Sequence, residues 1–196
     1  MLVPIEYDLT DRLAKFAASL TSHSADGLLL LRNFVPAKTL SKYSRMVELT
    51  DFHPIDHEGV VKRYENAGDL PSGFFPRSIL RCISQVRRAL YDMRPLIAER
   101  YLFKYVPGQS LPPHKDIDRH IITAILYFGD FRGGEYCYEA VEGVVEIDVK
   151  PGDVLISVNE LPDGTVLNPT HWVKCIQSGM RYCAVVSYTL RAASNS

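Results

Sequence analysis

The pattern of apolar and polar positions divides the chain near Tyr101 into a helix-rich first half and a strand-rich second half. In the first half, apolar residues recur at helical spacing in three segments, 8–20, 36–49 and 76–93. The last is the clearest, because one side of it is apolar and the other carries basic side chains. Its apolar stripe comprises Ile79, Leu80, Ile83, Val86, Leu90 and Met93. We therefore expect three helices in this half.

Two other parts of the first half lack this spacing. The run Gly27–Val35 is apolar and is ended by Pro36, which predicts a short buried strand. Residues 51–75 are rich in His, Pro, Gly, Asp and Asn, which predicts a long loop with one short strand at Val60–Tyr64. Because long loops in compact domains tend to be functional, we expect this one to contribute to a site, with Val60–Tyr64, including Arg63, as a lid.

The second half consists of short segments rich in β-branched and aromatic residues, separated by turns with Gly, Pro or Asp. The predicted strands are Tyr101–Val106, Ile121–Phe128, Glu135–Glu139, Val144–Val149, Val154–Val158, His171–Ile176 and Arg181–Leu190. Such a series is typical of a β-sandwich or barrel with helices packed on one outer face. We expect an α+β fold in which residues 1–100 form a helix-rich support and lid region and residues 101–190 form a β-barrel core.

Length and charge narrow the class of protein. The 196 residues fit a single domain, 1–196, and the formal net charge of -1 creates no global attraction to nucleic acid or to an anionic membrane. Apolar runs such as Leu28–Leu31 are too short to span a bilayer, and the first residues lack the features of a signal peptide. The four cysteines show no C-x-x-C spacing, so we expect reduced thiols in a cytoplasmic protein.

The candidate chemistry begins at His114 and Asp116, which lie two residues apart. Side chains at i and i+2 of an extended segment point to the same face, so both can reach one ion. His171 is the best candidate for a third ligand. Two histidines and one carboxylate form the facial triad of non-haem Fe(II) oxygenases, which leaves coordination positions open. The sequence therefore predicts a metal site at His114, Asp116 and His171.

Taken singly, each of these residues also has a simpler interpretation. His114, beside Pro113, fits a surface histidine, and Asp118 is as good an acidic neighbour as Asp116. His171 alone fits a hydrogen-bonded histidine of the core. The metal site is therefore predicted from the whole series of motifs and their order, and no single residue carries it.

The series of motifs has a known counterpart. In chain order it consists of Lys104-Tyr-Val-Pro-Gly108, His114-Lys-Asp116, Thr123-Ala-Ile-Leu-Tyr127-Phe, Gly133-Gly-Glu135, Lys150-Pro-Gly-Asp153, and His171 followed ten residues later by Arg181. This region resembles the core of the Fe(II)/2-oxoglutarate-dependent dioxygenases, most closely their prolyl-4-hydroxylase-like branch. The resemblance implies a double-stranded β-helix, a jelly-roll or cupin-like barrel, with the N-terminal helices as buttresses.

The resemblance also implies the metal and the reaction. Fe(II) would be bound by His114, Asp116 and His171, with 2-oxoglutarate as co-substrate and ascorbate as a further cofactor. Related halogenases replace the acidic ligand by a small residue, so the presence of Asp116 favours hydroxylation. The expected reaction is hydroxylation of a C–H bond in a small molecule or in an amino-acid or peptidyl substrate, with release of succinate and CO2.

Four residues are implied in binding 2-oxoglutarate. A basic residue at the place of Arg181 pairs with the distal carboxylate in this family, and the planar fork of arginine suits that task. The hydroxyls of Tyr105 and Tyr127, and more weakly that of Thr123, are candidates for the same co-substrate. Tyr105 and Tyr127 also fit core aromatic residues with a satisfied hydroxyl.

Two other functions remain open. The Tyr-x-Pro-Gly and His-x-Asp motifs also occur in AlkB-like enzymes, so AlkB- or TET-like oxidation or dealkylation of nucleic-acid bases is the first alternative. Those repair enzymes carry a second arginine soon after the co-substrate arginine, whereas Arg191 lies ten residues beyond Arg181. A non-oxidative cupin-like metal-binding barrel is the second. We expect no membrane partner, and we expect the substrate to contact residues 51–75, 115–120 and 159–170.

Overall fold

The computed structural model describes residues 11, 15, 26–57, 60–66, 75, 77–91, 96–116 and 120–190. Within these residues lie two antiparallel sheets and two helices, α2 (Ala37–Val47) and α3 (Arg77–Tyr91). The seven-stranded sheet has the order β1 (Leu28–Leu31), β9 (Val154–Val158), β6 (His120–Gly133), β11 (Ile176–Leu190), β4 (Leu96–Tyr105), β3 (Val60–Asn66) and β2 (Phe52–His57). The four-stranded sheet has the order β5 (Leu111–His114), β10 (His171–Val173), β7 (Tyr136–Ala140) and β8 (Gly143–Ile147).

The alternation of side chains along β6 shows how the large sheet is buried on both faces. Successive residues of a strand point to opposite faces. The even-numbered set joins the core beneath the helices and consists of Ile122, Ala124, Leu126 and Phe128. The odd-numbered set lines a cavity on the other face and consists of Thr123, Ile125 and Tyr127. The large sheet therefore has a packing face, which is covered by the helices, and a cavity face, which lines the cavity.

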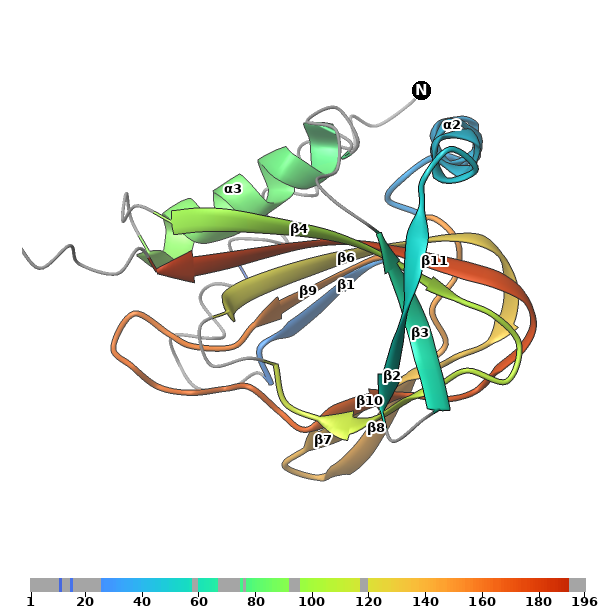
Figure 1. Ribbon diagram of the computed structural model, residues 1–196. Coiled ribbons are helices and arrows are strands. Elements are labelled where there is room, and N and C mark those ends of the chain that lie inside the picture. The colour runs from blue at the N-terminus through green and yellow to red at the C-terminus, as the bar shows by residue number, and fades with distance from the viewer. Residues whose placement is uncertain are drawn as a thin grey trace, which may run out of the picture.

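The helices cover the packing face. α3 buries Ile79, Ile83 and Val86, and α2 buries Tyr43 and Val47, in one cluster with the outer residues of the sheet. Figure 1 shows α3 lying along one side of the large sheet, with β10, β7 and β8 on the opposite side. This arrangement leaves the inner face of the large sheet free to form the cavity with the small sheet.

The seven strands predicted after residue 101 are all present, with shifted ends, and the helices predicted at 36–49 and 76–93 are confirmed as α2 and α3. The strand predicted at Gly27–Val35 is confirmed as β1, a shorter edge strand whose residues are only partly buried apart from Leu31. The helix predicted at 8–20 lies outside the described residues except for Asp11 and Lys15, which are helical and form an ion pair of 2.6 Å.

The strand predicted at Val60–Tyr64 is confirmed as β3, but the loop predicted before it was wrong, because β2 pairs with β3 in an antiparallel hairpin. The polar composition and Pro54 had suggested a loop. β2 is an edge strand of the large sheet. On its outer side no neighbouring strand needs the N–H that proline lacks, and polar side chains can face solvent. The short strand β5, Leu111–His114, was not predicted, because its two prolines resemble turn residues.

No helix among the described residues is long and apolar enough to cross a membrane. The cysteines Cys82, Cys137, Cys175 and Cys183 are free thiols, as expected, and only Cys175 is exposed.

Candidate metal centre

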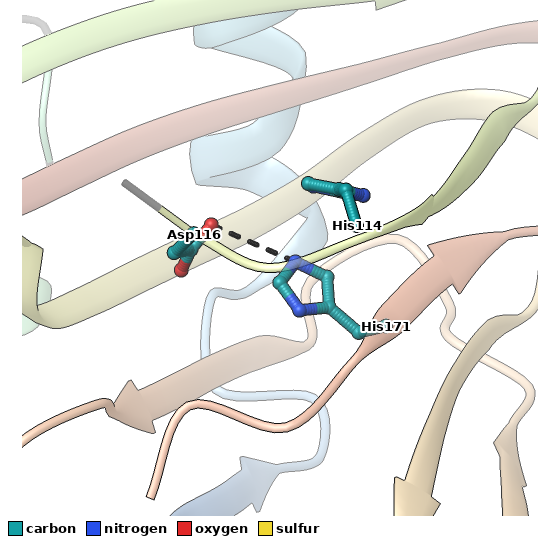
Figure 2. Close-up of side chains that lie close together, drawn as sticks. All are labelled: His114, Asp116 and His171. Atoms are coloured by element: carbon teal, nitrogen blue, oxygen red, sulfur yellow. Dashed lines mark ion pairs between the residues drawn. The ribbon is translucent and has the colours of Figure 1, made fainter. Parts of the chain in front are cut away.

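Two neighbouring strands of the small sheet bring the predicted ligands together. His114 ends β5 and His171 begins β10, and the two residues are paired directly across the ladder. Asp116 follows β5 by two residues and returns toward the same point (Figure 2). One donor atom from each of the three side chains lies within 4.8 Å of the other two. The geometry therefore brings together three residues that span more than fifty positions of the chain.

Both imidazole rings are held by the main chain. Nδ1 of His114 lies 2.9 Å from the carbonyl oxygen of Pro112, and Nδ1 of His171 lies 3.1 Å from that of Pro169. A carbonyl oxygen can only accept a hydrogen bond, so we assign the proton of each neutral ring to Nδ1. The lone pair of each Nε2 is then available to a metal ion, which is the usual arrangement of a metal-binding histidine.

Two asparagines orient Asp116. Nδ2 of Asn159 donates to Oδ2 of Asp116 at 3.0 Å, and the Asn168 side chain accepts from the Asp116 main-chain N–H at 3.2 Å and donates to its carbonyl at 3.0 Å. Oδ1 of Asp116 remains 3.6 Å from Nε2 of His171, too far for a hydrogen bond. One carboxylate oxygen is therefore anchored and the other faces the imidazoles. The sequence analysis did not assign a role to either asparagine.

Burial keeps the histidine and tyrosine of this site uncharged. Burial, and then the nearby His171, lower the pKa of His114, which favours the neutral ring that a metal ion requires. The Tyr136 ring stacks on His171 at a centroid distance of 5.4 Å. Burial, and then the Asp116 carboxylate and Tyr138, raise the pKa of the Tyr136 hydroxyl, so it stays protonated beside the acid.

The three ligand candidates open into a cavity of about 350 Å³ between the two sheets. That volume is in the range of small-molecule sites in proteins. Its polar and charged lining consists of Arg63, Glu65, Tyr101, Tyr105, His114, Lys115, Asp116, His120, Thr123, Tyr127, Tyr136, His171, Arg181 and Ser187. Apolar walls are contributed by Phe103, Leu111, Ile125, Val173 and Val185.

Arg181 is a buried cation at this cavity. Only 1% of it is exposed, its Nη1 donates to the carbonyl of Gly134 at 2.5 Å, and its guanidinium lies 4.4 Å from the centre of the Tyr105 ring. Its Nε has no hydrogen-bond partner, and no carboxylate among the described residues forms an ion pair with it. A buried arginine without an anion is costly, so Arg181 is available to pair with an anion that enters the cavity.

Gly134 makes the position of Arg181 possible. Its φ of +74° is the left-handed conformation that glycine adopts without strain. A methyl group on its Cα would lie 2.3 Å from Cδ1 of Ile176 and 2.9 Å from Nη1 of Arg181. Gly134 thus provides space and an acceptor for the arginine.

The other residues predicted to bind the co-substrate all line the cavity. Of the segments predicted to contact the substrate, 51–75 and 115–120 contribute lining residues, whereas 159–170 contributes none. Tyr105 and Tyr127 are buried, and the Tyr127 hydroxyl has no hydrogen-bond partner, although burial and then Cys183 raise its pKa well above the usual value. The Thr123 hydroxyl instead lies 3.1 Å from that of Ser187. His120 is held at Nε2 by Glu99 at 3.1 Å. Of these groups, the Tyr127 hydroxyl is therefore the one left unsatisfied.

Comparison with known proteins gives a fold. No protein-family model and no curated protein sequence matches the chain. Among solved structures, a prolyl hydroxylase from Trichoplax adhaerens in complex with a hypoxia-inducible-factor peptide matches at a TM-score of 0.72 and 17% identity, over 100% of this chain and 99% of that one. A prolyl-4-hydroxylase from Pseudomonas putida matches at 0.68 and 17% identity, over 92% and 100% of the two chains.

HygX from Streptomyces hygroscopicus, solved with nickel, 2-oxoglutarate and hygromycin B, matches at 0.64 and 15% identity, over 89% and 87% of the two chains. The chain therefore has the fold of the Fe(II)/2-oxoglutarate oxygenases that include the prolyl hydroxylases.

Proposed function

We propose that the protein is an Fe(II)- and 2-oxoglutarate-dependent oxygenase that hydroxylates a C–H bond. The observation that carries this proposal is the content of one cavity. Two imidazoles and a carboxylate converge at one point of its wall, and a buried arginine without an anionic partner lines it as well. This is the fold of oxygenases that need a metal and a dicarboxylate, and the cavity offers donors for both.

The donor set fits the metal. Its two neutral nitrogen donors and one carboxylate oxygen match the facial triad, and the imidazoles are already oriented by main-chain carbonyls. The other end of the co-substrate has donors in Arg181 and Tyr127, whose Nε and hydroxyl are buried without partners. A carboxylate placed there would satisfy both groups at once. The ascorbate implied by the sequence remains an expectation.

In this proposal His114, Asp116 and His171 hold the metal, and Asn159 keeps Asp116 from rotating away. Arg181 binds and orients the distal carboxylate of the co-substrate. When bound, Fe(II) and 2-oxoglutarate supply an oxidant: 2-oxoglutarate becomes succinate and CO2, and one oxygen atom of O2 enters the substrate C–H bond. The apolar cavity walls exclude bulk water from this reaction.

The same proposal covers the architecture. We infer that the two sheets form the double-stranded β-helix of the family, within one domain. The core is 101–190, and 1–100 contributes the helical support and, with the β2–β3 hairpin, a lid. One matched structure holds a peptide fragment and another holds hygromycin B, so we infer a peptidyl or small-molecule substrate.

The nucleic-acid alternative has less support. Arg81 and Arg88 of α3 are exposed, but α3 packs on the face of the large sheet opposite the cavity, and neither arginine lines that cavity. A basic groove leading to the metal would be needed for a polynucleotide.

Anaerobic absorption spectroscopy tests the proposal. We expect the protein with Fe(II) to develop a visible charge-transfer band on addition of 2-oxoglutarate, and to form succinate when O2 is admitted. His171→Ala should abolish the band. Arg181→Lys should keep it at saturating 2-oxoglutarate but weaken the affinity about tenfold, because the bidentate fork is lost.

A matched histidine provides the control. His53 is exposed on β2 and does not line the cavity, so His53→Ala should leave the band and the affinity unchanged. A wild-type protein that binds Fe(II) but never gives the band or succinate would contradict the proposal and favour a non-oxidative metal-binding barrel.

A further inference from the structure

A second arginine lines the cavity from a different element. Arg63 lies on β3, and its guanidinium sits 4.3 Å from the centre of the Phe103 ring of β4. β3 pairs with β4 through Tyr64–Lys104 and Glu65–Phe103, so Arg63 lies beside Tyr105 in the next position of the ladder. The β2–β3 hairpin thus carries a positive charge into the cavity.

Arg63 is short of partners. Its Nε is buried and has no hydrogen-bond partner. The nearest acid on the same face of β3 is Glu65, two residues away, yet no ion pair joins the two side chains. The Phe103 ring and the Tyr105 hydroxyl are the groups that Arg63 contacts, and neither supplies a negative charge, since burial and then Cys183 raise the pKa of Tyr105.

The number of buried polar groups without partners can be compared with the number of carboxylates in 2-oxoglutarate. In the described chain, three buried side-chain polar atoms lack a partner: Nε of Arg63, the Tyr127 hydroxyl and Nε of Arg181. All three residues line this one cavity. 2-Oxoglutarate has two carboxylates, one for the metal and one for Arg181 with Tyr127. Arg63 is therefore left over, and its guanidinium is available to pair with a further anion.

The cavity limits what that anion can be. The guanidinium fork binds a carboxylate through two parallel hydrogen bonds. Arg63 lies against the Phe103 ring, and Leu111 and Val173 add apolar lining to the same cavity, so an apolar body has surfaces to pack on beside the charged group. A cavity of about 350 Å³ that also holds 2-oxoglutarate has room for one small molecule or one side chain.

We propose that the primary substrate is a small carboxylic acid with an apolar body, whose carboxylate is bound by Arg63 of the β2–β3 hairpin. The inference rests on the proposed function. It makes the hairpin a specificity element, because the strand that covers the cavity also supplies the group that recognises the substrate.

The test is binding to protein loaded with Zn(II) and 2-oxoglutarate, which cannot turn over. The probes are 4-methylpentanoic acid and N-acetyl-leucine, each compared with its carboxamide, and followed by saturation-transfer NMR and calorimetry. We expect the acids to bind about tenfold or more tightly than the amides, since a charged hydrogen-bonded pair is lost in the amide. A capped peptide with one glutamate tests whether a side-chain carboxylate serves instead.

Variants assign the preference to Arg63. Arg63→Gln should abolish the preference for acids and leave the affinity for 2-oxoglutarate within about twofold. Lys62→Gln removes a positive charge from the same strand at a residue that does not line the cavity, and it should behave as wild type. If Arg63→Gln does not fold, Arg63→Lys replaces it, with an intermediate preference expected because the charge stays and the fork is lost.

Three results would overturn the inference. They are the absence of any acid preference in the wild type, a preference that survives in Arg63→Gln, or a tenfold loss of 2-oxoglutarate affinity in Arg63→Gln, which would make Arg63 a co-substrate ligand. Binding of the glutamate peptide but not of the small acids would refute a small-molecule substrate. Failure of the wild type to bind 2-oxoglutarate with the metal would instead refute the proposed function. Binding of the acids at Arg63 is a separate measurement, so the two failures can be told apart.

Discussion

Asn168 connects two ligands of the proposed metal without being one itself. It lies three residues before His171, and its side chain makes two hydrogen bonds to the main chain of Asp116. Such partners hold ligands in position, and their loss typically costs ten- to a hundredfold in metal affinity. We expect Asn168→Ala to weaken Zn(II) binding by about that factor, measured by competition with a chromophoric chelator.

A buried asparagine elsewhere separates metal affinity from stability. Oδ1 of Asn66 accepts from the Leu102 main-chain N–H at 2.7 Å, away from the metal ligands. Asn66→Ala should lower the free energy of unfolding and leave the Zn(II) affinity of the folded protein unchanged. Equal effects of the two substitutions on metal affinity would show that Asn168 acts only through folding.

Gly134→Ala tests whether Gly134 is needed for the position of the Arg181 side chain. The added methyl group would meet Ile176 and Arg181 at 2.3 and 2.9 Å, so the arginine has to move. We expect the affinity for 2-oxoglutarate to fall about tenfold in calorimetry on the Zn(II)-loaded protein, the size of one lost charged hydrogen bond.

Gly164→Ala is the matched control, because Gly164 also has a positive φ, +88°, but open space around it. Backbone strain should cost each variant about 1 kcal/mol of stability, and the clashes at Gly134 add a further loss in Gly134→Ala. Only the change at Gly134 should affect the co-substrate, and an equal loss of affinity in both variants would count against this role of Gly134.

At the level of elements, α3 supports the sheet without contributing to the site. Ile83 is completely buried beneath this helix, in the cluster on the packing face. Ile83→Ala should reduce the free energy of unfolding by about 2–5 kcal/mol, as measured by urea denaturation, because it leaves a cavity. The affinity of the folded protein for 2-oxoglutarate should not change.

Leu49 provides the comparison, since 90% of its surface is exposed just after α2. Leu49→Ala should alter stability by no more than about 0.5 kcal/mol. A co-substrate affinity that falls with Ile83→Ala would mean that the packing face and the cavity face are coupled through β6.

The elements that could be predicted from the sequence are those whose own residues show the apolar pattern of a buried strand or helix. β6 and β11 are central and covered on both faces, so they read as long apolar segments, and α3 has an apolar stripe. β2 was missed because its assignment depends on a partner strand. Pro54 and its polar neighbours are compatible with an edge, and only the pairing of β3 with β4 makes this segment part of the sheet.

The residues of the site also fall into those predictable from local motifs and those placed by contacts between distant parts of the chain. The positions of His114, Asp116, His171 and Arg181 were predicted because their motifs are local and ordered along the chain. Arg63 was expected in a lid over the site, but its place beside Tyr105 depends on a hairpin about forty residues upstream in the chain, and no local pattern predicts that contact. Asn168, by contrast, precedes His171 closely enough for its position to have been noticed.

For the whole molecule, buried tyrosine hydroxyls and a buried thiol with raised pKa values predict that the folded protein loses stability at alkaline pH. Burial is the main cause that raises the pKa of Tyr105, Tyr127, Tyr136 and Cys183. Raised values mean that the folded state holds its protons longer than the unfolded chain. The corresponding stability is complete below the unfolded pKa, about 8.5 for a thiol and about 10 for a phenol, and is lost as the pH rises through the folded pKa.

We therefore expect the free energy of unfolding to be constant between about pH 7 and pH 8.5 and to decrease steadily toward pH 11. Denaturant titrations at several pH values measure this. The tyrosinate absorbance of the buried residues should appear together with unfolding. Early, non-cooperative ionisation of all eleven tyrosines in the folded protein would contradict the buried environment of these hydroxyls.

The two imidazoles of the metal centre share one local design: each hydrogen-bonds the carbonyl of a proline two positions earlier, Pro112 or Pro169. Short proline-stiffened segments thus fix ring orientation before any ion arrives. Capture of a metal ion should then be limited by the ion's loss of water and not by a search among side-chain rotamers. Ions that exchange water quickly, such as Mn(II), should load at once, whereas Ni(II), which exchanges slowly, should load with a lag that stopped-flow absorbance can time.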